Sequence, residues 1–265
     1  MSARRPGLSP AVLAGAAIVV AVLACGEVPT LPGGIAYISP VILPSPAVAF
    51  GDTLRDSTGV AAPLRIFAFG QTGDTIDVTP SYVVTTLPGK SATISASGFV
   101  VGDSVRAVQI VGRVGDRLQT PPVAFDVVRQ PDSIATTQTT KLVLGEVTTG
   151  ELFSISGALT ATVTTGATTT RSGVKGIIVR YSVTNVYPST ATIPDTTIVL
   201  IDDLNRFIFP TGRTAVDTTD SQGNASRRLR AVPFGFDSVE IKATANDLKG
   251  IPLHGSPIRF VVATK

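Results

Sequence analysis

Side chains that could do chemistry are few in this 265-residue chain, which holds one cysteine, Cys25, and one histidine, His254. A serine-nucleophile relay needs a histidine base, but His254 stands beside Gly255, as a turn or strand-end residue does. The sequence has no Gly-x-Ser-x-Gly elbow and no phosphate-binding loop. Zinc would need a cluster of His and Cys ligands. We therefore expect no catalytic residue, no cofactor and no enzymatic activity.

Calcium is the metal that the remaining oxygen ligands would suit. The densest group of such ligands is Asp202, Asp203 and Asn205. Asp and Asn also favour turns, because their side chains bond their own backbone, and no evenly spaced Asp-x-Asp-x-Asp run occurs. The turn interpretation is preferred, so we expect no metal site, and these three residues are the weak candidates for one.

Aromatic residues give little sign of a sugar-binding face, because Trp is absent and the four Tyr are scattered. Phe67 and Phe69 are two residues apart, as are Phe234 and Phe236, so each pair shares one face of an extended strand. A core face is the simplest interpretation. Phe234 and Phe236 are the pair that best fits the alternative, an exposed contact patch, because Pro233 and Gly235 favour a loop there.

Cys25 follows a segment with the three parts of an export signal. Arg4 and Arg5 form a basic region, residues 11–23 are apolar, and small Ala24 precedes the cysteine. Thirteen apolar residues fall short of a comfortable bilayer span. Val22-Leu23-Ala24-Cys25 resembles the lipobox of bacterial lipoproteins, which implies that residues 1–24 are a signal peptide and that Cys25 is lipidated. The alternatives are an ordinary secretory signal and an uncleaved anchor.

The lipoprotein resemblance also implies a location and a first partner. Gly26, rather than Asp, follows the cysteine, so retention at an inner membrane is not signalled, and we expect attachment to an outer membrane through the N-terminal lipid. Residues 25–34 have no periodicity and predict a flexible tether. Without Arg4 and Arg5, the 22 basic residues fall to 20 against 19 acidic ones. A net charge of about +1 gives no basis for binding nucleic acid.

Thr, Val, Ile, Gly and Pro dominate the chain after residue 25, which favours strands and turns over helices. We expect an all-β fold, with a helix only in the signal. Gln130-Pro131-Asp132 interrupts the pattern and predicts a boundary between domains at 35–129 and 130–265. In the first, a bulge is expected near Val108. Its predicted strands cover residues 35–39, 46–50, 62–69, 74–86, 92–96, 98–101, 104–111 and 122–128.

Apolar and polar residues alternate cleanly in the second half, at 159–164, 177–184 and 239–246. This period of two predicts strands with one buried face. Residues 196–201 form a branched run that predicts a central strand, and 257–262 predict the last one. Such one-sided strands belong to antiparallel sheets packed face to face. The sequence therefore predicts two tandem antiparallel β-sandwiches.

Residues 219–225, Thr-Asp-Ser-Gln-Gly-Asn-Ala, precede the alternating segments 226–231 and 237–243. Asp220 can cap a turn with its side chain, Gly223 can adopt a positive φ, and small Ala225 can begin an inward-facing strand. This stretch resembles group 1 bacterial Ig-like domains, the repeats of invasin and intimin-type adhesins. The resemblance implies an Ig-like sandwich.

Residues 92–100 and 102–107 resemble, more weakly, group 2 bacterial Ig-like domains. The two resemblances imply a structural spacer or an adhesion and binding module at the cell envelope, with an envelope protein or a polysaccharide as partner. The alternatives are a glycan-binding accessory lipoprotein and a periplasmic assembly factor.

Overall fold

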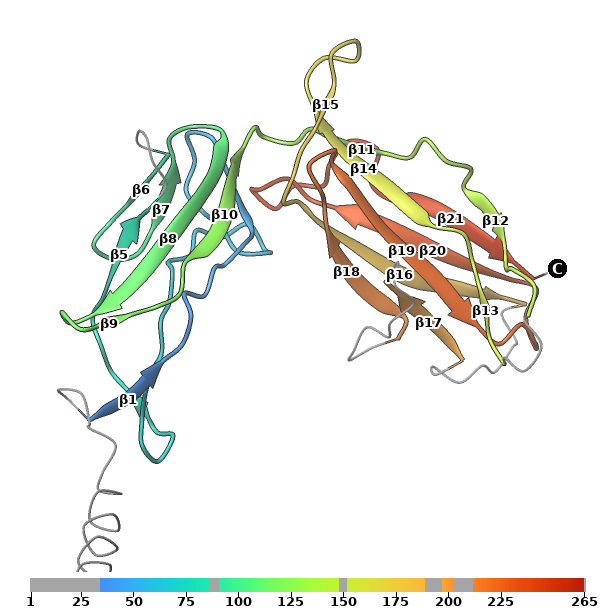
Figure 1. Cartoon of the computed structure of the whole chain (residues 1–265). Coiled ribbons are helices and arrows are strands. Elements are labelled where there is room, and N and C mark those ends of the chain that lie inside the picture. Colours follow the sequence, from blue (N-terminus) through green and yellow to red (C-terminus); the bar gives the residue numbers. More distant parts are fainter. Residues whose placement is uncertain (1–33, 86–90, 148–151, 189–196, 203–211, 265) are drawn as a thin grey trace, which may run out of the picture. The chain divides into compact units, whose positions relative to one another are not determined.

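The computed structural model describes residues 34–85, 91–147, 152–188, 197–202 and 212–264. Their regular structure consists of strands alone, so the all-β prediction is confirmed (Figure 1). The predicted signal helix at residues 1–24 and the tether at 25–34 lie outside this part of the chain, except for Gly34. Within the described ranges, no helix has the length and apolar character needed to cross a bilayer.

The chain consists of two compact units. Of the described residues, the first unit holds 34–39 and 67–78, and the second holds 40–66 and 79–264. Every described sheet takes its strands from one side of residue 130 alone. The division into domains at that residue stays a prediction.

The first unit is a small antiparallel sheet in the order β1-β3-β4. Its strands are β1 (Ile35–Ile38), β3 (Ala68–Gly70) and β4 (Thr75–Ile76). The turn between β3 and β4 contains Gly73, whose φ of 86° lies in the left-handed region that suits glycine. A register shift between Ile35 and Tyr37 marks a bulge in β1.

The second unit begins with a sheet in the order β2-β10-β8-β5, to which β9 adds beside β8. These strands are β2 (Ala47–Ala49), β5 (Pro80–Val84), β8 (Arg106–Val114), β9 (Leu118–Gln119) and β10 (Val123–Val128). A separate hairpin pairs β6 (Ala92–Ile94) with β7 (Val100–Gly102). Because β2 and β10 run parallel, the prediction of purely antiparallel sheets is wrong at this edge.

Three details of the first half differ from the sequence-based expectation. Most of the predicted strand 62–69 is irregular, with Arg65 in one isolated bridge to Ile42. The predicted strand 74–86 divides into β4 and β5. No bulge occurs at Val108, since β8 pairs with β10 in unbroken register. Val105 precedes β8 and is exposed, so it does not belong to the buried face on which Val108 and Ile110 lie.

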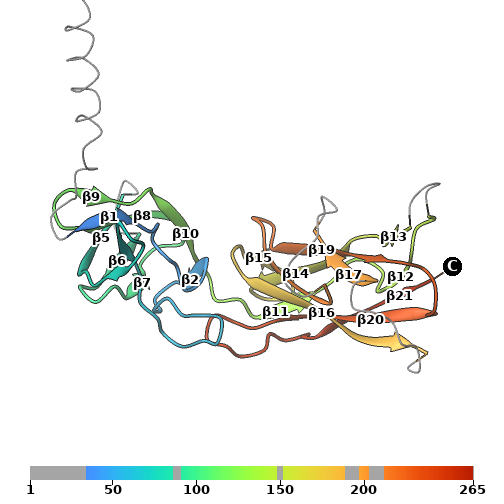
Figure 2. The same ribbon diagram turned by 90° about the horizontal axis from the view of Figure 1, so that it is seen from below.

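Two sheets make up the rest of the second unit, and Figure 2 shows β14, β17 and β19 in one layer and β16, β20 and β21 in the other. The first sheet contains β11 (Ser133–Ala135), β13 (Ser154–Ile155), β14 (Leu159–Thr165), β15 (Ser172–Gly173), β17 (Ile198–Ile201) and β19 (Asn224–Ala231). The second sheet contains β12 (Lys141–Val143), β16 (Ile178–Tyr187), β18 (Thr214–Thr218), β20 (Ser238–Ala245) and β21 (Ile258–Ala263). Here too one edge pair, β12 with β21, is parallel.

The structure confirms the buried face that alternation predicts for each long strand. Leu159, Val179 and Ile241 are fully buried, and each lies on the apolar face that the period of two assigns to its strand. Fully burying such a side chain contributes about 1.5–3 kcal/mol. Tyr181 is buried as well, and its hydroxyl donates a hydrogen bond to the Ala225 carbonyl at 2.8 Å. The shared core is what holds the two layers face to face.

Within the branched run at 196–201, Ile198–Ile201 form β17, and all four residues are buried. Its position is not central, because within the described strands β17 pairs with β19 alone. Ile198 and Leu200 belong to the core that the two layers share, whereas Val199 and Ile201 are buried outside that core cluster.

Candidate functional site

Several predicted site residues lie outside the described part of the chain. Cys25 is one of them, and Asp203 and Asn205 of the weak calcium group are the others. Asp202 follows β17 and is half-buried. Across the described residues, no three His, Cys, Asp or Glu side chains gather as a metal site would require.

The predicted contact patch at Phe234 and Phe236 does not form as one surface. Phe234 is 77% exposed, whereas Phe236 is 5% exposed and belongs to the core. Gly235, with a φ of 84°, separates them. Because Gly235 takes a left-handed conformation, the backbone is not an extended strand here, and residues two apart need not share a face. The exposed part of the patch is Phe234.

Asp220, Gly223 and Ala225 form a turn that leads into a buried strand. The Asp220 carboxylate accepts hydrogen bonds from the N–H groups of Gln222 and Asn224, at 2.8 and 2.9 Å. The φ of Gly223 is 81°, and a Cβ there would lie 2.3 Å from the Val163 carbonyl oxygen. Ala225 is buried at the start of β19. Asp220 and Gly223 thus shape the turn, and no ligand is needed to explain them.

The same Asp-x-x-Gly turn occurs twice more, at Asp56–Gly59 and Asp247–Gly250. In each turn, Oδ1 of the aspartate accepts hydrogen bonds from the second and the fourth N–H after it, at 2.8–3.1 Å. The glycine N–H donates back to the aspartate carbonyl, at 3.0 Å in the first and 3.1 Å in the second. The glycine φ angles are 85° and 84°. The Asp-x-x-Gly spacing of both turns is visible in the sequence, although we assigned a capping aspartate and a positive-φ glycine only to the turn at Asp220.

These two turns lie against each other, backbone to backbone. A Cβ at Gly59 would lie 2.3 Å from the Lys249 carbonyl oxygen, and a Cβ at Gly250 would lie 2.6 Å from the Thr58 carbonyl oxygen. Real Cβ atoms do not approach backbone oxygens so closely. Glycine is therefore required on both sides, for its positive φ and for the space. We call this pair of turns, Asp56–Gly59 and Asp247–Gly250, the turn junction.

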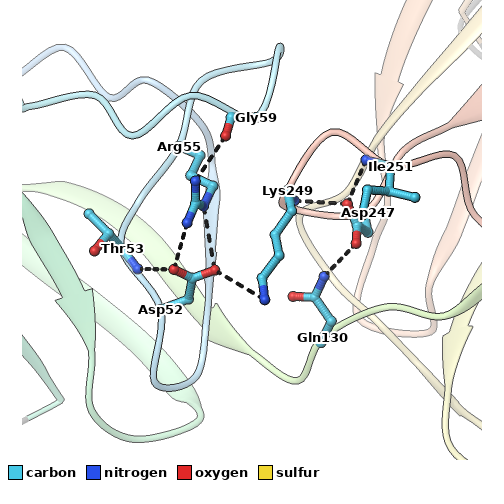
Figure 3. Close-up of polar contacts among 8 residues, drawn as sticks. All are labelled: Asp52, Thr53, Arg55, Gly59, Gln130, Asp247, Lys249 and Ile251. Carbon is cyan, nitrogen blue, oxygen red and sulfur yellow. Dashed lines mark hydrogen bonds and ion pairs between the residues drawn. The ribbon is translucent and has the colours of Figure 1, made fainter.

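Charged side chains surround the turn junction, as Figure 3 shows. The Arg55 guanidinium contacts Oδ1 of Asp52 at 3.0 Å and donates to the Gly59 carbonyl at 3.0 Å. On the other side, Lys249 Nζ lies 4.0 Å from Oδ2 of Asp52. Asp52 therefore faces one cation from the chain before residue 130, Arg55, and one from the chain after it, Lys249. A second ion pair, between Lys175 and Asp126 at 3.0 Å, also joins residues on the two sides of residue 130 in the sequence.

The pKa of Asp52 is set by opposing effects. Burial is the largest single effect and raises the pKa. Hydrogen bonds from Arg55 and from the Thr53 N–H, together with the positive charges of Arg55 and Lys249, outweigh it and hold the pKa below its ordinary value. Asp52 is consequently an anion at neutral pH and attracts both cations.

In the segment between β10 and β11, residues 129–132, Gln130 and Asp132 are hydrogen-bonded to strands and loops that follow it. Gln130 Nε2 donates to Oδ2 of Asp247 at 2.9 Å, and the Gln130 carbonyl accepts from the Thr165 hydroxyl at 2.7 Å. Pro131 is buried. The Asp132 carboxylate accepts from the Gly166 N–H at 2.8 Å, and its carbonyl accepts from the His254 N–H at 3.1 Å. These bonds fix the segment to the part of the chain that forms the two packed sheets, the one with β14 and β19 and the one with β16, β20 and β21.

An open pocket of about 100 Å³ lies beside the turn junction. Arg55, Asp56, Arg180 and Asp247 are among its lining residues. Ligand sites for drug-sized molecules are about 300–1,000 Å³ and mostly apolar. A gap this small, with charges of both signs, is a space between packed turns and is not built for a small molecule.

No family model matches this chain, and no curated protein matches it. Among solved structures, it is distantly similar to the adhesin InvE from Yersinia pseudotuberculosis, with 13% sequence identity over 87% of this chain and a TM-score of 0.30. It is also similar to domains 4 and 5 of the surface layer protein SbsC, with 13% identity over 86% of this chain and 99% of that one and a TM-score of 0.30. The D00-D0 domain of intimin gives 13% identity over 86% of this chain and 99% of that one, with a TM-score of 0.25.

The chain spans 60% of the InvE chain and 31% of a structure of SbsC domains 4–9. At such low TM-scores, these likenesses carry no functional inference.

Proposed function

We propose that this chain is a non-catalytic lipoprotein of the cell envelope, anchored through Cys25, whose β-sheet segments act as a spacer that holds its C-terminal part at a set distance from the membrane. The observation that carries the spacer role is the fixed segment 129–132. The anchor rests on the signal that ends at Cys25.

A spacer must resist bending between its consecutive parts. Flexible linkers allow a wide spread of end-to-end distances, and relative motion between domains is the default unless their contact is extensive. Here the connecting segment has four residues, and Gln130, Pro131 and Asp132 are hydrogen-bonded or buried. The turn junction adds steric contact at Gly59 and Gly250. Both features oppose bending at this point of the chain.

The ion pairs alone would not hold the two regions in place. Asp52 with Lys249 and Asp126 with Lys175 are partly exposed, and exposed pairs contribute about 0–1 kcal/mol each. Close contact between the two turn backbones resists relative motion more strongly, because closely packed atoms cannot move toward each other without a cost in free energy. We therefore assign the resistance to bending to the glycines and the short segment, and the choice of orientation to the charges.

Membrane fractionation tests the anchor. We expect the wild-type chain, expressed in its native cells, to sediment with membranes and to carry a lipid on the peptide that begins with Cys25. The Cys25→Ser variant is expected in the soluble fraction, because a chain without the acyl group keeps no lipid contact through its N-terminus. Mass spectrometry of the N-terminal peptide measures the modification directly. Equal membrane association of the two proteins would contradict the proposal.

A further inference from the structure

Three aromatic side chains lie together on the small sheet of the first unit. Tyr37 on β1 stacks on Phe69 of β3, with ring centroids 4.7 Å apart and an interplanar angle of 16°. Phe67 lies 6.5 Å from Phe69, measured between ring centroids. Tyr37 is 54% exposed and Phe67 is 40% exposed. We call Tyr37, Phe67 and Phe69 the aromatic patch.

The aromatic patch is held in place by its own backbone. Tyr37 and Phe69 are direct partners in the register of β1 and β3. The Phe67 N–H donates to the Ser39 hydroxyl at 2.9 Å, and the Phe67 carbonyl accepts from the Ser39 N–H at 2.8 Å. Phe67 and Phe69 were expected to share a core face, but neither is fully buried. Contiguous exposed apolar side chains are the kind of surface at which proteins contact partners or membranes.

The charges of the first unit indicate what kind of partner fits. Its described residues include Asp74 and Asp77 and no Lys or Arg. The described residues of this sheet therefore provide no positive charge to attract anionic lipid or an acidic polymer. Aromatic side chains sit favourably at the boundary between lipid headgroups and acyl chains, where an apolar ring and a polar group are both accommodated. Tyr37, with its hydroxyl, suits that boundary best.

The chain between Cys25 and β1 limits how far the aromatic patch can lie from an anchored lipid. Ile35 is ten residues after Cys25. A fully extended chain spans at most about 3.6 Å per residue, so the reach is at most about 36 Å. A tether that short keeps the patch at a high effective concentration beside the bilayer. Weak insertion of two or three rings then suffices for contact.

We propose that the aromatic patch contacts the bilayer surface to which Cys25 is anchored, with Tyr37 at the headgroup boundary, so that the sheet of the first unit lies on the membrane. This role rests on the lipid anchor proposed above. Since no basic residue among the described residues of the unit takes part, the contact is expected on zwitterionic vesicles and is insensitive to salt.

A single tryptophan tests the proposal, because the chain has none of its own. In the mature chain, which begins at Cys25, Tyr37→Trp places the reporter in the aromatic patch. Cys25 is the only cysteine, so its thiol can be coupled to a maleimide lipid in phosphatidylcholine vesicles, which supplies the anchor whether or not cells lipidate the protein. Tyr187→Trp is the matched control, since Tyr187 is 43% exposed and lies in the second unit.

We expect lipids with a headgroup-proximal spin label to quench the indole of the Tyr37→Trp variant about twofold more strongly than that of the Tyr187→Trp variant, because interfacial aromatic rings lie at headgroup level. High salt should leave the difference unchanged. Adding Phe67→Ser to the Tyr37→Trp variant should reduce the quenching, while circular dichroism checks that the sheets remain folded.

Equal quenching in the two tryptophan variants would overturn the proposal. So would an emission spectrum of the Tyr37→Trp variant that is insensitive to vesicles but shifts with envelope polysaccharide. Failure of Cys25→Ser to leave native membranes would instead contradict the anchor alone.

Discussion

Three turns of this chain are each capped by an aspartate side chain, at Asp56, Asp220 and Asp247. Each carboxylate replaces a missing backbone partner for two N–H groups, and each turn has its glycine three residues later. The pattern explains why Asp is found at these positions without any need for a metal. It also means that a carboxylate cluster in a sequence is weak grounds for a calcium site unless the turn interpretation has been tested first.

Replacing Asp220 with alanine should destabilise the protein. The change removes two hydrogen bonds at an exposed turn, each with a net contribution of about 0.5–1.5 kcal/mol. We expect a loss of about 1–2 kcal/mol in the free energy of unfolding, measured by urea denaturation. Ser221→Ala, at an exposed neighbour in the same turn, is the control and should change little. Equal losses in both variants would contradict the capping role.

Asp52 makes stability depend on pH. Its pKa is lowered in the folded state, so the charged form stabilises the fold. This contribution is present above the ordinary value of 3.8 and is lost as the pH falls through the folded pKa. We expect the free energy of unfolding to decrease below about pH 5, and to decrease less steeply in Asp52→Asn. Denaturation curves at several pH values measure both slopes, and parallel slopes would be the contrary result.

At the scale of elements, alternation predicted the long strands of the second pair of sheets well. β14, β16 and β20 lie where the period of two places them, because their faces differ sharply in polarity. β21 lies at the predicted last strand. The short strands of the first half were predicted poorly. Three-residue strands such as β3 hold too few residues to show a period, and the predicted strand at 62–69 is mostly irregular.

The turn junction could not be predicted from sequence. Asp-x-x-Gly indicates a turn and nothing about what the turn touches, since Gly59 and Gly250 are far apart along the chain. Such contacts depend on the register of several strands at once. The parallel edge pairs β2 with β10 and β12 with β21 were missed for a related reason: alternation gives the buried face of a strand but not the direction of its neighbour.

Gly250→Ala tests the turn junction directly. The variant places a Cβ 2.6 Å from the Thr58 carbonyl oxygen, and it also strains a positive φ. Gly73→Ala is a matched control, because its φ of 86° is nearly the same and nothing lies within 4 Å of the added atom. Strain alone costs about 1–2 kcal/mol. We expect a larger fall in melting temperature for Gly250→Ala, and equal shifts in thermal unfolding would argue against close packing at the junction.

At the scale of the whole molecule, the chain joins a predicted lipid anchor to sheets whose described residues form no metal cluster. What such a protein offers its surroundings is position and surface. The short segment 129–132 and the turn junction suit the first role, and the aromatic patch suits contact near the anchor. Stiffness across residues 129–132 is therefore the central claim.

Pulsed electron resonance between two spin labels measures that stiffness most directly. Val105 and Val216 are about half exposed and lie on opposite sides of residue 130, so labelled Val105→Cys and Val216→Cys in a Cys25→Ser chain report the distance between the regions. A variant with a Gly-Ser insertion after Arg129 serves as the flexible reference. The account predicts one narrow distance distribution that the insertion broadens. A distribution already as broad as that of the insertion variant would contradict it.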